Sequence, residues 1–379
     1  MRILILGAGL MARGAVDDFL RDHRVQSLVV ADSSSDALCA LHERFPDRRL
    51  VTTIFAADDT EEVTALMQKA DGVFCSVHYG FNTEFTQAAI ATQTHMVDLG
   101  GNNDVVAAQL AMSREAEAAG VTVIPDCGLA PGMVSVLVAW GLKRFAWADS
   151  VKIRVGGIPA APQPPFYYER LFSVEGLINE YVEPPLLWRN GRLVTGEPLG
   201  DVEAVEFDPP VGTLEAFNTS GGLSTLAKTF GARVKNLDYK TLRYPGHALA
   251  MQWLLHLGLF SSEPTVFDEQ EIVPRRLVAD LIVARVPLGE RDRTVVRVEF
   301  SGRDGTQTRV HRLDIVDEHD PKSGLTSMMR MTAFPAAIIL QMICDGRIAR
   351  RGVLPQEIAV DPDAFVAELA RRNIRISGL

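Results

Sequence analysis

The sequence predicts an α/β protein in which a Rossmann doubly wound parallel sheet is joined to an α+β domain built on a mixed sheet. Over the first third, short apolar runs alternate with segments of helical periodicity, a pattern typical of parallel strands covered by helices. The length of 379 residues also exceeds what one hydrophobic core usually serves. We expect a first domain at 1–128, a second at 129–328, and helices at 329–379 that return to the first.

The elements of the first domain follow in order along the chain. Helix boundaries are indicated by Thr60 at a helix start, by Asn82 as a cap and by Gly120 at a helix end. The expected helices include "DDTEEVTALMQKA" (58–70) and "VVAAQLAMSREAEAA" (105–119). The expected strands are "RILIL" (2–6), "SLVVA" (27–31), "DGVFCSV" (71–77), "HMVDL" (95–99) and "VTVIP" (121–125).

Composition disfavours several classes of protein. A formal net charge of -10 repels phosphate backbones and anionic lipid, so we expect no nucleic-acid partner and no membrane partner. The apolar run 334–344 contains Gln341 and is shorter than the about 20 residues that span a bilayer, which predicts a buried helix. The amino terminus has too few apolar residues for a signal peptide.

The four cysteines are scattered, with no CxxC pair and no histidine at metal-ligand spacing. This pattern predicts reduced thiols, a cytoplasmic location and no bound metal. The cysteines are Cys39, Cys75, Cys127 and Cys344.

The opening stretch "ILILGAGLMARG" (3–14) places Gly7, Gly9 and Ala12 in a GxGxxA motif between a strand and a helix. Such glycines permit a tight turn and let backbone amides approach a pyrophosphate, although they also occur in purely structural turns. Asp32 lies about 20 residues beyond the motif, where a carboxylate reaches ribose hydroxyls and repels the extra phosphate of NADP. NAD is therefore the expected cofactor. The other residues expected at the dinucleotide are Leu10, Met11, Ser76, Gly100 and Asp126.

Polar segments follow three of the expected strands, where ligands of a doubly wound sheet bind. His78 is a candidate proton shuttle or a solvated loop residue, and Tyr79 either stacks beside the cofactor or closes the core. Asp98 lies next to two glycines and is either a general base or a helix cap. Asp126 is more simply explained as a helix cap.

After residue 150 the pattern changes to mixed strands and turns, with a tight hairpin expected at "RNGR" (189–192). The segment "LEAFNTSGGLSTL" (214–226) clusters hydroxyls around two glycines and indicates either an anion-binding nest or an ordinary turn. Arg243, in "YKTLRYPGH" (239–247), is expected either to bind a carboxylate or to be solvated. The expected substrate-binding residues are Asn218, Thr219, Ser220, Gly221, Arg243 and Tyr168.

These segments together resemble the saccharopine dehydrogenase-like superfamily, most closely its L-lysine 6-dehydrogenase branch. The sequence departs from that branch at Glu169, Arg170 and Asn218. The motifs that carry the resemblance are "ILGAGLM" (5–11), "YGFN" (79–82), "VDLGG" (97–101), "IPDCGLAPGM" (124–133), "VGGIP" (155–159), "FSVEGL" (172–177), "LEAFNTSGGLSTL" (214–226), "KTLRYPGH" (240–247) and "RRGVLPQEI" (350–358).

The resemblance implies NAD-dependent oxidative deamination of the side-chain amine of L-lysine to allysine, which cyclises to a piperideine carboxylate. Asp98, His78 and Tyr79 are then the candidates to accept the proton of the amine, and Arg243 would anchor the distal carboxylate. The alternatives are a saccharopine or carboxynorspermidine dehydrogenase and a non-catalytic NAD-binding protein. A homodimer or homotetramer is expected.

Overall fold

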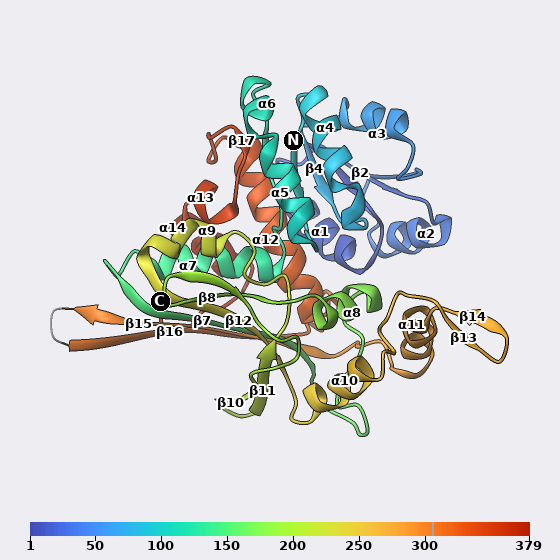
Figure 1. The fold of residues 1–379 in the computed structure, drawn as a ribbon. Coiled ribbons are helices and arrows are strands. Elements are labelled where there is room, and N and C mark those ends of the chain that lie inside the picture. Colours follow the sequence, from blue (N-terminus) through green and yellow to red (C-terminus); the bar gives the residue numbers. More distant parts are fainter. Residues whose placement is uncertain (305–306) are drawn as a thin grey trace. The chain divides into compact units, whose positions relative to one another are not determined.

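The computed structural model describes residues 1–304 and 307–379, which form two compact units (Figure 1). The first unit comprises Met1–Lys143 and Met329–Ile374, and the second comprises Arg144–Met328 and Arg375–Leu379. Residues 129–143, which the sequence suggested as the start of the second domain, lie in the first unit.

The first unit is built on a parallel sheet, which confirms the predicted doubly wound class. Within the described residues this sheet has seven strands, in the order β17-β6-β5-β4-β1-β2-β3. The strands are β1 (Arg2–Leu6), β2 (Ser27–Asp32), β3 (Leu50–Ile54), β4 (Gly72–Cys75), β5 (His95–Asp98), β6 (Thr122–Ile124) and β17 (Gly352–Val353). The flanking helices are α1 (Leu10–Arg21), α2 (Ser35–Arg44), α3 (Thr60–Met67), α4 (Asn82–Ala91), α5 (Asn103–Ala111), α6 (Ser113–Ala118), α7 (Val134–Leu142), α12 (Ser327–Cys344), α13 (Gln356–Ala359) and α14 (Pro362–Arg371).

The start of α3 agrees with the sequence expectation, and other helix boundaries in this unit differ from it. α3 begins at Thr60, as predicted, and its cap is Asp59, whose side chain accepts a hydrogen bond from the backbone N–H of Glu62. Asn82 lies inside α4, and its side-chain oxygen accepts a bond from the thiol of Cys75. The helix expected at 105–119 breaks at Met112 into α5 and α6.

Residues 329–374 complete the first unit as expected, whereas Arg375–Leu379 belong to the second unit. β17 adds a strand beside β6, through the register pairs Gly352 with Thr122 and Val353 with Val123. α12 is long and apolar enough to cross a membrane, but 89% of its most apolar stretch is buried inside the protein. The side chain of its Gln341 donates a hydrogen bond of 2.9 Å to buried Asp18 of α1. This contact is what we expect of a helix in the core of the unit.

The second unit is built on a mixed sheet with the path β10-β11-β12-β7-β15-β16, in which β12 and β7 run parallel. Asn190 and Gly191 both have positive φ and form the predicted tight turn, between β8 and β9. The strands are β7 (Ala148–Pro159), β8 (Leu186–Arg189), β9 (Arg192–Thr195), β10 (Glu203–Phe207), β11 (Gly212–Asn218), β12 (Val234–Arg243), β13 (Thr265–Phe267), β14 (Gln270–Ile272), β15 (Asp292–Asp304) and β16 (Gln307–Glu318). The helices are α8 (Val174–Val182), α9 (Leu226–Phe230), α10 (His247–His256) and α11 (Pro274–Arg285).

Side chains of β12 alternate between two different surroundings. Asp238 and Lys240 point to a face of ion pairs, where Asp238 lies 2.6 Å from Arg154 of β7. Tyr239, Thr241 and Arg243 occupy the alternate positions and therefore point to the opposite face. This alternation separates a structural charge network from the buried polar cluster described below.

Candidate functional site

The turn between β1 and α1 has the geometry of a phosphate cradle. Gly7 has a φ of +99°, and a Cβ there would lie 2.9 Å from the hydroxyl of Ser76, so a larger residue does not fit. Gly9 precedes α1, and no described side chain caps the helix at this point. A Cβ at Gly9 would meet nothing within 4 Å, so open space lies at the helix N-terminus. Free backbone amides facing open space suit an anion such as a pyrophosphate.

Asp32 is fixed beside this turn at the end of β2. Its carboxylate accepts hydrogen bonds from the backbone N–H of Ala8, at 2.6 Å, and of Ser34, at 2.8 Å. Leu10 and Met11 form the first turn of α1 and are partly buried. The residues present therefore fit a dinucleotide, with the pyrophosphate on α1 and the ribose hydroxyls near Asp32.

The loops after β4, β5 and β6 meet at the same edge of the sheet, as the sequence predicted. The ring of Tyr79 packs so closely on Gly101 that a Cβ there would lie 2.7 Å from its Cδ1 atom. A Cβ at Gly100 would overlap the carboxylate of Asp126. Glycine is thus required at both positions for the loops to approach one another.

Asp98 has a structural position. Its carboxylate is 1% exposed and accepts bonds from the backbone N–H of Gly100 (2.8 Å), from that of Asp126 (3.2 Å) and from the side chain of Gln109 (2.8 Å). Burial raises the pKa of this carboxyl, although the three donors oppose the shift. A group so occupied ties the loops together, and this geometry favours that structural role over the general base that the sequence also suggested.

His78 and Tyr79 lie nearer to solvent. His78 is exposed, its Nδ1 accepts a hydrogen bond of 3.1 Å from the N–H of Gly80, and its ring centroid lies 4.2 Å from that of Tyr79. In the neutral ring this bond places the proton on Nε2, so His78 donates from that atom. Tyr79 is partly buried against Gly101 and remains a candidate for proton transfer.

The second unit contains a buried cation with an unused donor. Arg243 is 3% exposed, and its Nη1 donates to the carbonyl of Leu242 at 3.0 Å. Its Nε has no hydrogen-bond partner among the described residues. The ring centroid of Tyr168 lies 5.3 Å from the guanidinium carbon, a cation–π distance. A buried guanidinium with a free N–H is suited to a carboxylate ligand.

Neutral aromatic groups and one carboxylate surround Arg243. Burial raises the pKa of Glu180, at the end of α8, to about 7, although Arg243 opposes the shift. The hydroxyl of Tyr181 lies 2.9 Å from Nε2 of His247. Burial, together with Arg243, lowers the pKa of His247 to about 3, so this imidazole is neutral. Arg243 is therefore the cation that acts on Glu180 within a mostly neutral buried cluster.

The turn after β11 differs from the anion-binding nest that the sequence suggested. The backbone N–H of Ser220 donates to the carbonyl of Glu180, and that of Gly222 donates to the carbonyl of Ser220, so both are already used. Gly221 has a φ of +83°. The turn therefore connects β11 to α8 and positions Glu180.

Thr219 lies on the face of the mixed sheet that carries Arg243, whereas Asn218 lies on the opposite face. The hydroxyl of Thr219 lies 2.7 Å from that of Thr241, two residues before Arg243. Asn218 is in register with Lys240, so its side chain is on the ion-pair face instead. We therefore remove Asn218 from the expected substrate site.

Sequence reasoning missed Glu180 and Tyr181. The sequence contains only a weak indication of Glu180. This residue borders the buried stripe of α8, formed by Leu177, Ile178 and Tyr181, and its position in the helical pattern is typical of a solvated residue. Only the packing of α8 against β11 and β12 brings it beside Arg243.

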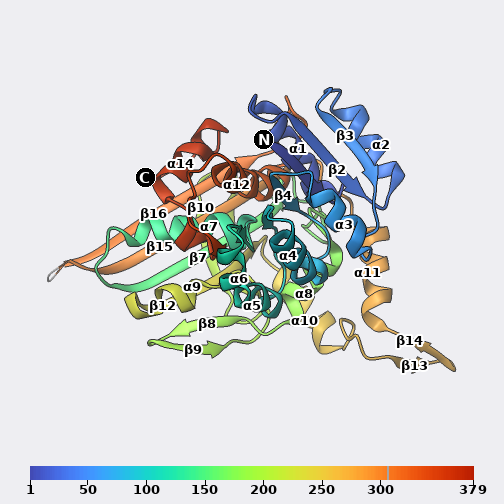
Figure 2. The same ribbon diagram turned by 90° about the horizontal axis from the view of Figure 1, so that it is seen from above.

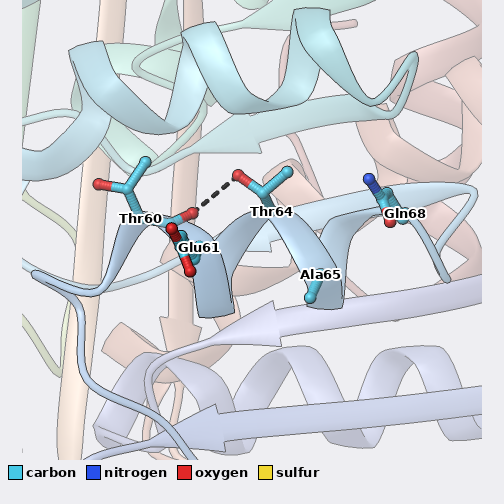
Figure 3. A pocket seen from close by; sticks show the side chains of 5 residues that line it. All are labelled: Thr60, Glu61, Thr64, Ala65 and Gln68. Atoms are coloured by element: carbon cyan, nitrogen blue, oxygen red, sulfur yellow. Dashed lines mark hydrogen bonds between the residues drawn. The ribbon is translucent and has the colours of Figure 1, made fainter.

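A separate shallow pocket lies along α3 (Figure 3). Its lining comes from Thr60, Glu61, Thr64, Ala65 and Gln68, all on one helix and its end. The hydrogen bond drawn there, from the Thr64 hydroxyl to the Thr60 carbonyl, is internal to the helix. This pocket gathers no groups from other elements and is not a candidate site. Over the described residues, no group of three histidine, cysteine or carboxylate side chains could hold a metal.

Two family models together match nearly the whole chain. Residues 3–124 match the saccharopine dehydrogenase NADP binding domain, and residues 128–374 match the saccharopine dehydrogenase C-terminal domain. The first match covers the glycine turn and Asp32, and the second covers Glu180 and Arg243.

Known proteins with similar sequences agree with these matches. A saccharopine dehydrogenase [NADP(+), L-glutamate-forming] of Pyricularia oryzae is 22% identical over 98% of this chain and 96% of its own length. The alpha-aminoadipic semialdehyde synthase of Bos taurus is 23% identical over 74% of this chain. The chain spans about a third of the length of such mammalian relatives, since the match covers 31% of the bovine protein.

Solved structures share the fold. The apo saccharopine dehydrogenase (L-Glu forming) of Saccharomyces cerevisiae superimposes with a TM-score of 0.80 at 18% identity, covering 100% of this chain and 99% of that one. The homospermidine synthase of Legionella pneumophila, in complex with NAD, gives 0.70 at 11% identity over 99% and 90% of the two chains. With its nicotinamide-nucleotide cradle and the two matching domains, the chain belongs to the saccharopine dehydrogenase family of NAD(P)-binding oxidoreductases.

Proposed function

We propose that the protein catalyses NAD-dependent oxidative deamination of the ε-amino group of L-lysine, giving allysine, ammonia and NADH. The observation that supports this proposal most directly is that buried Arg243, which has a free Nε–H, lies near enough to the carboxylate of Glu180 to oppose the rise in its pKa. One cation and one acid match the α-carboxylate and α-ammonium of a single amino-acid head group. Saccharopine carries three carboxylates, which is more than the single guanidinium of Arg243 can pair with.

The chain's own residues account for binding and orientation. Arg243 would hold the α-carboxylate through its guanidinium, and Glu180 would hold the α-ammonium, which fixes the lysine side chain in one direction. The rings of Tyr168 and Tyr181 exclude water from that end. A bound nicotinamide would accept hydride from the carbon that carries the ε-amine.

Proton transfer must precede hydride loss, because the nitrogen lone pair has to be free. A free lysine amine keeps its proton up to a pH of about 10.4. We assign the acceptance of this proton to the phenolate form of Tyr79, since the carboxylate of Asp98 is fully bonded and Nδ1 of His78 already accepts a hydrogen bond from the backbone.

The cofactor preference is proposed on the same basis. Asp32 would bind the ribose hydroxyls of NAD and would repel the 2′-phosphate of NADP. The family model is named for NADP, so both dinucleotides belong in the first experiment.

The deciding experiment measures initial rates of NADH or NADPH formation with L-lysine at mildly alkaline pH. Saccharopine, L-ornithine and D-lysine serve as comparators. We expect turnover of L-lysine with NAD. Measurable NAD binding with no lysine turnover would refute the proposal.

Saccharopine oxidation is the second candidate. It is favoured by the Pyricularia oryzae relative, which aligns over 98% of this chain. Turnover of saccharopine in the same assay, with release of L-glutamate, would select this candidate instead.

The role of Glu180 predicts a specific pH dependence. Because burial raises its pKa to about 7, Glu180 is charged above that pH and loses its hold on the α-ammonium below it. We expect the slope of log kcat/KM against pH to rise from about one above pH 7, due to the ε-amine, to about two below it. Glu180→Gln should lower kcat/KM by about 10- to 100-fold and abolish the steeper limb.

Glu175→Gln is the matched control, because Glu175 lies on the same helix but pairs with Arg275 away from Arg243. It should retain both limbs. An unchanged profile in Glu180→Gln would show that Glu180 does not bind the substrate.

A further inference from the structure

Two residues beside Arg243, Tyr181 and His247, form a buried hydrogen-bonded pair to which the proposed reaction gives no chemical role. The hydroxyl of Tyr181 lies 2.9 Å from Nε2 of His247. Tyr181 belongs to α8 and His247 begins α10, two helices that lie side by side in both views (Figures 1 and 2). The pair therefore links these two helices next to the guanidinium of Arg243.

The hydroxyl of Tyr181 also interacts with Arg243. Burial raises the pKa of Tyr181 to about 12, although the charge of Arg243 and a side-chain hydrogen bond with it oppose the shift. A guanidinium has only donors, so the oxygen of Tyr181 accepts the hydrogen bond in this contact. The phenol is protonated at neutral pH and therefore has its own O–H left to donate.

His247 supplies an acceptor for that O–H. Burial, together with Arg243, lowers the pKa of His247 to about 3, so the ring is neutral and one of its nitrogens has a free lone pair. The positive charge nearby favours a lone pair over an N–H at the atom that faces Tyr181. The hydrogen bonds then run from Arg243 to Tyr181 and on to Nε2 of His247, whose proton is on Nδ1.

The position of His247 is fixed by Glu215 of β11. The two oxygens of Glu215 accept hydrogen bonds from the backbone N–H groups of Gly246, at 2.9 Å, and of Ala248, at 2.6 Å. These bonds hold the turn at which α10 begins and, with it, the backbone of His247. The imidazole also stacks on the ring of Phe217, with 6.2 Å between centroids and 15° between planes.

The same carboxylate bears on the charge of Arg243. Glu215 and Arg243 are directly opposite each other in the register of β11 and β12, an arrangement in which opposite charges commonly pair. Both oxygens of Glu215 are instead engaged by the start of α10. Tyr181 is a neutral partner, so it restrains the guanidinium without cancelling the positive charge that a carboxylate ligand needs.

We propose that Tyr181 and His247 are positioning residues that hold the guanidinium of Arg243 in the orientation in which it binds the substrate carboxylate. Tyr181 contacts the guanidinium, and His247 acts through Tyr181 by fixing the direction of its hydroxyl. The inference rests on the proposed function, because that function places the α-carboxylate at Arg243. It implies that the pair favours amino acids over amines that lack a carboxylate.

Binding of L-norleucine tests the proposal without turnover. This amino acid has the α-carboxylate and α-ammonium of L-lysine but no ε-amine, and calorimetric titration at mildly alkaline pH with saturating NAD gives its Kd. Tyr181→Phe should raise the Kd by about 10-fold or more, because it removes a hydrogen bond to a charged group and keeps the ring. Tyr244→Phe is the matched control, since the Tyr244 hydroxyl lies 3.5 Å from the carbonyl of Pro159, and it should retain the wild-type Kd.

Variants of His247 test the second link. His247→Leu removes the acceptor and should weaken binding of L-norleucine about as much as Tyr181→Phe does. His247→Gln should retain more of the affinity, because its side-chain oxygen can accept near the position of Nε2. The losses in the double variant Tyr181→Phe/His247→Leu should not add, because both act through one chain of hydrogen bonds. If a variant of buried His247 fails to fold in a thermal melt, the result with Tyr181→Phe decides.

Kinetics distinguish positioning from a general structural effect. In Tyr181→Phe the loss with L-lysine should appear in KM rather than in kcat. The ratio of kcat/KM for L-lysine to that for 1,5-diaminopentane, which lacks the carboxylate, should fall by about 10-fold. A merely structural role would lower both values alike and leave the ratio unchanged.

The outcomes separate this inference from the proposed reaction. Equal Kd values for L-norleucine in the wild type and Tyr181→Phe would overturn the inference, as would additive losses in the double variant or a wild type that does not bind L-norleucine. Weaker binding by Tyr181→Phe, with no turnover of L-lysine by the wild type, would support the inference and refute the reaction.

Discussion

Replacing Arg243 with methionine should lower kcat/KM for L-lysine by about 10²–10³-fold. The variant loses the buried partner of the substrate carboxylate, which costs about 3–4 kcal/mol at such sites. The chain should still fold, because methionine fills much of the same volume and the neighbouring Glu180 can bind a proton. Initial rates over a range of lysine concentrations give the effect on kcat and KM.

Arg243→Lys separates charge from geometry. Lysine keeps the positive charge but lacks the planar fork, so we expect an intermediate loss of about 10-fold or more. Lys152→Met is the control, because Lys152 is an exposed residue of β7 on the ion-pair face. NAD affinity should be unchanged in all three variants. Wild-type kinetics in Arg243→Met would remove Arg243 from the substrate site.

Gly9→Ala should raise the Kd for NAD by about 100-fold without affecting stability. The new Cβ meets no protein atom within 4 Å, and Gly9 has a φ of -70° that alanine adopts readily. The methyl group would instead occupy the space in which backbone amides approach the pyrophosphate, with a loss of about 3 kcal/mol of charge-assisted hydrogen bonding. Fluorescence titration with NADH measures the affinity.

Gly7→Ala provides the contrasting variant. Its φ of +99° and the closeness of Ser76 make alanine strained, so the melting temperature should fall by about 4–8 °C for a cost of about 2 kcal/mol. A thermal melt of Gly9→Ala should match that of the wild type. Tight NADH binding by Gly9→Ala would show that the open space is not the phosphate site.

The sequence predicted the first unit better than the second. The GxGxxA turn, Asp32 and the meeting of three strand-end loops depend on local spacing within a regular parallel sheet, and all appear in the structure. The role of Asp98 was harder to predict, because its three donors come from two loops and from Gln109 of α5.

The polar cluster of the second unit depends on contacts between distant segments. The sequence predicted that Arg243 either binds a carboxylate or is solvated, and its burial depends on α8 and on the loop that carries Tyr168. Asn218 and Thr219 are neighbours in sequence, yet the alternation of β11 sends them to opposite faces. A one-residue uncertainty in register is enough to exchange such assignments.

The parallel sheet of the first unit contains a strand from the far end of the chain. β17 pairs with β6, and α12 and α14 belong to the same unit, whereas Arg144–Met328 form nearly all of the other unit. During synthesis on a ribosome, the strands from β1 to β6 emerge long before their last neighbour does. The nucleotide-binding unit therefore reaches its final sheet only after residues 144–328, nearly all of the mixed-sheet unit, have been translated.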